Sequence, residues 1–97
     1  MYECHITFEN VDSELEVRLL AYASEVGWKT SFIDGDPALG PGKRFFLTSH
    51  ASNLEDMYVN MRLVSIQAPA VPIREKIEQI VHDTKYNLYL ERMPNEA

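Results

Sequence analysis

Cysteine is scarce in this sequence, because Cys4 is the single one among 97 residues. One cysteine can form neither an internal disulfide framework nor a zinc site built from several cysteines. Basic residues are also few, with nine Lys and Arg against fifteen Asp and Glu, and they are scattered along the chain. The formal net charge of −6 argues against nucleic acid as a partner, since such binding depends on neutralising phosphates.

Long apolar runs are missing as well. No stretch approaches the ~18 residues of a membrane span, and the first residues include Glu3, His5 and Glu9 where a signal peptide has basic and apolar regions. We therefore expect a cytoplasmic protein that binds no membrane. With 45% apolar residues the chain can form one core, and we expect a single domain over residues 1–90 and a flexible tail over 91–97.

The first half of the chain predicts a strand and then a helix. Residues 2–9 alternate apolar and polar side chains, which is the period of a half-buried strand. Residues 13–26 carry apolar side chains at helical spacing. Ser13 and Glu16 have the spacing of an N-terminal capping box, and Gly27 supplies the stop.

Two further strands and a second helix follow. Residues 28–33 and 43–50 are rich in aromatic and β-branched side chains, and turn-forming residues over 34–42 separate them. The next apolar stripe predicts a helix that has Ser52 or Asn53 as its N-cap and ends before Pro69.

Residues 72–83 fit either a strand or a helix. Ile73 and Ile77 suit a helix that begins at Pro72, and they suit a strand only if Glu75 or a bulge is tolerated. We expect a strand, because otherwise one edge of the first strand stays unpaired. The resulting order, β-α-β-β-α-β, predicts an α+β fold of the ferredoxin-like plait type, with two helices on one face of a four-stranded antiparallel sheet.

Three segments of the chain carry a family resemblance. They are Tyr2-Glu3-Cys4-His5-Ile6-Thr7, the block from Gly27 to Pro37, and Ile73-Arg74-Glu75-Lys76-Ile77-Glu78 with the following Asp83-Thr84-Lys85. In these segments the chain resembles a group of small, uncharacterised bacterial proteins. The resemblance implies a fold and no particular activity.

The predicted topology brings polar side chains together on the sheet face away from the helices. Alternation puts Glu3, His5 and Thr7 on that open face, and the first and third strands are neighbours in this topology. The candidate residues are His5, Thr7, Thr48 and His50, bordered by Lys29 or Arg74. Such a patch is either a ligand site or a surface that a second copy covers.

The leading hypothesis is a non-enzymatic module that binds a small ligand or another protein and acts as a homo-oligomer. Self-association would use the open sheet face or the edge second strand, with Trp28, Phe46 and the loop at 35–42 as contact elements. No cofactor is expected. A ligand held between two protomers is a variant of the same hypothesis.

The alternative is a small phosphodiester-processing enzyme. The pattern His-x-Thr occurs twice, as His5-Ile6-Thr7 and His82-Asp83-Thr84, and resembles the paired motif of the 2H phosphoesterases. That resemblance implies histidines as general acid and base, with hydroxyls that hold the phosphate. Here His5 would work with His50 or His82. The second motif departs from the family, because Lys85 stands where an apolar residue is expected.

Other chemistry finds little support. The loop before Arg44 lacks the glycine spacing and the Ser or Thr of a phosphate-binding loop. His5, His50 and His82 show no metal-ligand spacing, so no metal site is predicted. Cys4 falls on the apolar face of its strand, where burial makes a thiol a poor nucleophile.

Overall fold

The computed structural model describes residues 1–36 and 40–80 and confirms the ferredoxin-like plait. In chain order its elements are β1 (Tyr2–Glu9), α1 (Ser13–Val26), β2 (Lys29–Asp36), β3 (Gly40–Ala51), α2 (Leu54–Gln67) and β4 (Arg74–Gln79). The predicted domain end at residue 90 and the tail over 91–97 lie outside the described residues. Neither described helix is long and apolar enough to cross a membrane.

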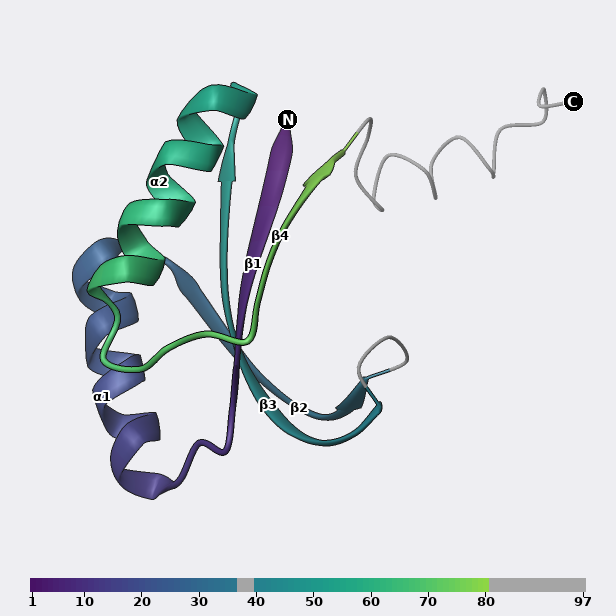
Figure 1. Ribbon diagram of the computed structural model, residues 1–97. Coiled ribbons are helices and arrows are strands. Elements are labelled where there is room, and N and C mark those ends of the chain that lie inside the picture. Colours follow the sequence, from purple (N-terminus) through teal and green to yellow (C-terminus); the bar gives the residue numbers. More distant parts are fainter. Residues whose placement is uncertain (37–39, 81–97) are drawn as a thin grey trace, which may run out of the picture.

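The four strands form one antiparallel sheet in the order β2-β3-β1-β4, with β1 and β3 at its centre. Both helices lie on the same side of this sheet, and the opposite side is open (Figure 1). Cys4 in β1 lies opposite Ser49 in β3 and Ile77 in β4. This register decides which side chains of the three strands share the open face.

The hairpin between β2 and β3 differs from the prediction. Its strands continue to Asp36 and from Gly40, so most of the segment predicted as a loop over 34–42 belongs to the sheet. The register shifts between Asp34 and Asp36, and the intervening Gly35 has φ 91°. Glycine adopts this left-handed conformation without a Cβ clash, which lets the strand continue past an irregularity that looks like a turn in sequence.

Side-chain caps determine where each helix begins. The N-cap of α1 is Asp12, one residue before the predicted Ser13, and its carboxylate accepts a hydrogen bond from the backbone N–H of Leu15 at 2.8 Å. Gly27 ends the helix with φ 77°, as predicted. For α2 the N-cap is Asn53 rather than Ser52.

In the uncertain segment 72–83, residues Arg74–Gln79 form a strand. The side chain of Glu75 lies on the helix side of β4, opposite Ile6 in β1. There the Arg62 guanidinium of α2 donates hydrogen bonds of 2.6 Å to both carboxylate oxygens of Glu75. A charged side chain is therefore tolerated on this side of the sheet because a helix residue pairs with it.

The core lies between the sheet and the helices. Its buried apolar side chains come from β1, β3, both helices and the residue before β2: Cys4, Ile6, Phe8, Leu19, Ala23, Trp28, Phe45, Leu47, Met57, Met61 and Val64. The Tyr22 hydroxyl donates a hydrogen bond of 2.7 Å to the Val64 carbonyl and ties α1 to α2. Burial raises the pKa of the Cys4 thiol to about 12, in agreement with its predicted inert role.

Candidate functional site on the open sheet face

The open face carries the polar side chains that strand alternation predicted. His5 lies opposite Thr48 in β3, and on its other side it lies opposite Lys76 in β4. Thr7 lies opposite Arg74 in β4 by the same register. Because directly paired residues point to the same face of a sheet, side chains from three strands meet around His5.

Glu3 connects the two histidines of this face. One of its carboxylate oxygens lies 3.2 Å from Nε2 of His5, and the other lies 3.0 Å from Nε2 of His50. Both imidazoles remain partly exposed, at 29% and 36% of the side chain. The histidines are thus on one face, as predicted, and a carboxylate occupies the space between them.

The hydrogen bonds of His5 fix how its ring can be protonated. A carboxylate only accepts, so Nε2 carries the proton when it binds Glu3. Nδ1 lies 3.0 Å from the Thr48 hydroxyl, which can donate to a neutral ring or accept from a protonated one. Both protonation states therefore keep the ring in the same orientation.

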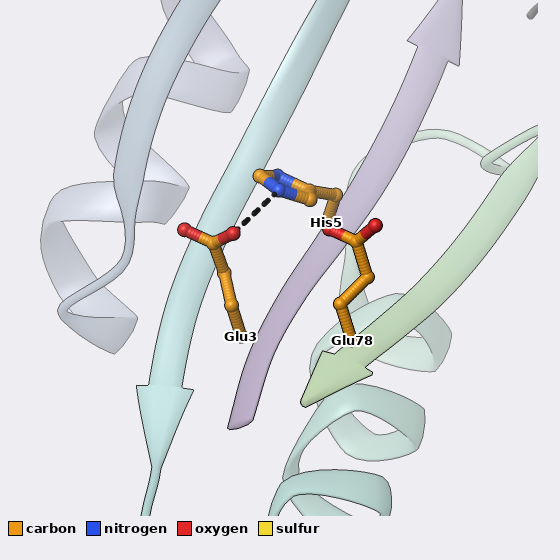
Figure 2. A group of neighbouring side chains, drawn as sticks. All are labelled: Glu3, His5 and Glu78. Atoms are coloured by element: carbon orange, nitrogen blue, oxygen red, sulfur yellow. Dashed lines mark hydrogen bonds and ion pairs between the residues drawn. The ribbon is translucent and has the colours of Figure 1, made fainter. Parts of the chain in front are cut away.

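Glu3, His5 and Glu78 form the group that comes nearest to a metal site in the described part of the chain. One ligand atom from each lies within 4.8 Å of the others, and Figure 2 shows the His5 ring between the two carboxylates. A nitrogen and carboxylate oxygens are ligands that divalent cations accept. However, Nζ of Lys76 lies 2.9 Å from Glu78 and lowers the pKa of that carboxyl, so the protein already supplies a cation there.

Beside His5 the open face is hollowed into a cavity of about 230 Å³, which we call the open-face cavity. Its wall combines hydroxyl, apolar, cationic and carboxylate side chains: His5, Thr7, Ser31, Ile33, Phe46, Arg74, Lys76 and Glu78. The Phe46 ring meets the His5 ring edge to face at a centroid distance of 6.5 Å. An apolar wall with a few convergent polar groups is the usual composition of a small-ligand site.

Charge is distributed unevenly between the two sides of the molecule. Among the described side chains of the strands, the open face holds four cations (Lys29, Arg44, Arg74, Lys76) and three carboxylates (Glu3, Glu9, Glu78), a net +1. The helices hold two cations (Arg18, Arg62) and five carboxylates (Glu14, Glu16, Glu25, Glu55, Asp56), a net −3. In an acidic protein the open face is therefore the surface that repels an anion least.

Two larger hollows, each of about 650 Å³, lie in the helix layer. One lies beside the connection from α2 to β4, where it reaches Arg74 at the edge of the sheet and where Arg62 is already paired with Glu75. The other lies between the C-terminal ends of α1 and α2. Neither contains a histidine. The smaller open-face cavity is the better candidate because its polar groups converge from three strands.

Arg44 is a buried cation on the open face, with 4% of its surface exposed. Its Nε and Nη2 atoms donate to one carboxylate oxygen of Glu9 at 3.1 and 2.8 Å, and Nη1 donates to the Gly40 carbonyl at 2.7 Å. These bonds tie β1 to the start of β3. Arg44 is therefore a structural residue beside the site.

The outcome differs among the other predicted residues. Lys29 lies opposite Thr48, on the border predicted for it. Phe46 is on the open face but only 8% exposed, because it forms part of the cavity wall. The prediction of Trp28 as a surface contact is wrong: the next residue, Lys29, lies on the open face, so alternation directs Trp28 to the helix side, where it packs in the core at 5% exposure. His82 and Thr84 lie outside the described residues.

Sequence reasoning missed four residues of the wall of the open-face cavity: Ser31, Ile33, Lys76 and Glu78. The last two could have been found, because Arg74, Lys76 and Glu78 alternate with Glu75 and Ile77 as in a strand. Their position next to His5 required the register of β4, which the uncertain segment did not provide.

The comparisons with known proteins give no family. No protein-family model matches the chain, and no curated protein sequence is similar to it. Among solved structures, it is similar to 5-chloro-2-hydroxyhydroquinone dehydrochlorinase (TftG) from Burkholderia phenoliruptrix AC1100, in complex with 2,5-dihydroxybenzoquinone. The identity is 14% and the TM-score 0.47, over 88% of this chain and 98% of that chain. A likeness of this size supports no inference about function.

Proposed function

We propose that the protein is a non-enzymatic module that binds a small organic anion in the open-face cavity. The proposal rests on Arg74, whose side chain is half-buried in the cavity wall. Within residues 1–36 and 40–80 its guanidinium makes neither a hydrogen bond nor an ion pair. Arg74 attracts the Glu78 carboxylate at longer range, but that carboxylate is already paired with Lys76. A partly buried guanidinium without a hydrogen-bonded partner is unfavourable, and an anion bound beside Arg74 would relieve that cost.

The wall of the cavity indicates which anion would fit. Phe46 and Ile33 offer an apolar surface, and the hydroxyls of Thr7 and Ser31 offer hydrogen bonds. The volume of 230 Å³ is below the roughly 300–1,000 Å³ of sites for drug-sized ligands. These properties favour a small carboxylic acid with a compact apolar body.

The proposal is tested by following backbone amide signals by NMR while sodium benzoate is added, with benzamide as the uncharged equivalent and sodium chloride at matched ionic strength. Benzoate should shift the signals of β1 and β4 around His5 and Arg74, and benzamide should bind more weakly. Arg74→Gln should weaken benzoate binding about tenfold or more, because a hydrogen-bonded charge contributes about 1.5–3 kcal/mol.

The matched control is Arg18→Gln, which removes an exposed arginine from α1 and should leave benzoate affinity unchanged. Equal binding to the wild type and Arg74→Gln would contradict the proposal. So would signals that respond to benzoate no more than to chloride.

A phosphodiester-processing enzyme is the second candidate function. The observation in its favour is that His5 and His50 lie on the same face and are both partly exposed. It ranks second because the Glu3 carboxylate lies between them, where a phosphate would be repelled. If this function is correct, the wild type hydrolyses bis(p-nitrophenyl) phosphate and both His5→Ala and His50→Ala abolish the reaction. Absence of hydrolysis by the wild type would exclude it for this substrate.

A further inference from the structure

Helix α2 is apolar on two opposite sides. Met57, Met61 and Val64 form the side that packs in the core. Val59, Leu63 and Ile66 have the same spacing and each follow a core residue by two positions, which is about 200° around a helix. A surface helix of a single globular domain normally has a polar outer side, so this second stripe is unusual.

The second stripe is exposed to solvent. Val59, Leu63 and Ile66 are 51%, 52% and 69% exposed. The apolar surface extends beyond the helix, because Ile66 lines the same hollow as Val71 and Ile73, which are 88% and 47% exposed. Contiguous exposed apolar surface of this kind marks a binding interface.

The outer side of α1 is different. Glu14, Arg18 and Glu25 lie among its exposed residues, and Val17 is its most exposed large apolar side chain. Helix α1 exposes two large apolar side chains, Val17 and Leu20, whereas α2 exposes five, namely Leu54, Tyr58, Val59, Leu63 and Ile66. This contrast locates the interface on α2.

We propose that the outer face of α2, defined by Val59, Leu63 and Ile66, binds the same face of a second copy of this chain. Glu55 and Arg62 decide the partner, because they are seven residues apart and so lie on one flank of the stripe, on either side of Val59. A two-fold axis beside Val59 makes the helices antiparallel and puts each Glu55 next to the Arg62 of the other copy. The surface is thus complementary to itself in charge.

Arg62 can take part in this pairing. It uses Nη1 for both of its hydrogen bonds to Glu75, and the guanidinium has further donors in a fixed fork. The proposed interface lies in the helix layer, which covers one side of the sheet (Figure 1). The open-face cavity is lined by side chains of the other side. Two copies joined through α2 would therefore leave both cavities open to solvent. The sequence favoured the open face or the β2 edge for self-association, and the exposed apolar residues favour α2 instead.

The test is sedimentation equilibrium of the full chain over a wide concentration range. The wild type should be a dimer, and Leu63→Glu should raise the dissociation constant at least about 30-fold, as expected for a residue at the centre of an interface. Leu63 is half-exposed, so the monomeric variant should keep its helical circular dichroism. Ile33→Glu on β2 is the matched control, because Ile33 is 42% exposed against 52% for Leu63, and it should leave the dimer intact.

A charge exchange tests the antiparallel arrangement. Glu55→Arg alone should weaken the dimer because it places cations side by side, and the double variant Glu55→Arg with Arg62→Glu should restore it. A wild type that stays monomeric at millimolar concentration would overturn the proposal. The proposal would also be overturned if Ile33→Glu abolished the dimer while Leu63→Glu left it intact. That result would place the interface at the β2 edge of the sheet.

Discussion

The two sides of the sheet differ in how their side chains are satisfied. On the helix side Ile6, Phe8 and Leu47 are almost fully buried and make apolar contacts with the helices. On the open side the side chains bind one another through charges and hydrogen bonds, as Glu3 does with His5 and His50. The difference indicates that the helix side supplies most of the stability, while the open side can vary its chemistry without loss of the fold.

This comparison predicts unequal costs for neighbouring residues of β3. Leu47→Ala on the helix side should lower the free energy of unfolding by about 2–5 kcal/mol, through lost burial and the cavity left behind. Thr48→Ala on the open side loses a hydrogen bond to His5 and should cost about 1 kcal/mol. Urea unfolding measures both variants. Equal losses of stability would show that side chains of the open side contribute more to the free energy of unfolding than their exposure indicates.

The side of the sheet on which the β1 side chains lie could be predicted from sequence, because the alternation of apolar and polar residues in this strand is a strong local pattern. The side of the sheet on which Cys4 and His5 lie followed from alternation, and the meeting of His5 with Thr48 followed from topology. In β4 the pattern was weaker because Glu75 occupies a helix-side position. Its partner Arg62 comes from another element, and no local pattern reveals such a pair.

The cavity itself was only partly predictable. Arg74 was expected on its border, but Lys76 and Glu78 depended on the register of β4. Trp28 was expected on the surface, whereas the next residue, Lys29, takes the open-face position and the indole is buried on the helix side. These cases share one cause, since a shift of one residue moves a side chain to the other side of a sheet.

Arg44 is the exception on the open side, and its replacement should sharpen the comparison. Arg44→Met removes hydrogen bonds to Glu9 and to the Gly40 carbonyl from a site that is only 4% exposed. We expect a loss of about 1–3 kcal/mol, because the remaining partners lose their donors in a water-poor environment. Urea unfolding again measures the change. A loss below that of Thr48→Ala would mean that the open side has no residue essential for stability.

The pH dependence of stability should report on the helix side through Cys4. Burial raises the pKa of its thiol from 9.0 to about 12 in the folded protein, so the unfolded chain loses this proton first as the pH rises. The contribution is complete below pH 9 and is lost between pH 9 and 12, with a slope approaching about 1.4 kcal/mol per pH unit. Unfolding curves at pH 8 and 10 should therefore differ more for the wild type than for Cys4→Ala. Equal differences would contradict a buried, protonated thiol.

The smallest effect is expected for the ion pair on the helix side, between Arg62 and Glu75. The Arg62 side chain is 44% exposed, so solvent screens the pair, and Glu75→Gln should cost no more than about 1 kcal/mol. The loss should shrink further in 1 M salt, where charges at an exposed site interact little. Arg44→Met, which replaces a side chain only 5% exposed, should stay costly in the same salt. Equal costs for Glu75→Gln and Arg44→Met would contradict this comparison. They would indicate that the side of the sheet on which a charge lies matters less for stability than whether the charge pairs with a residue of another element.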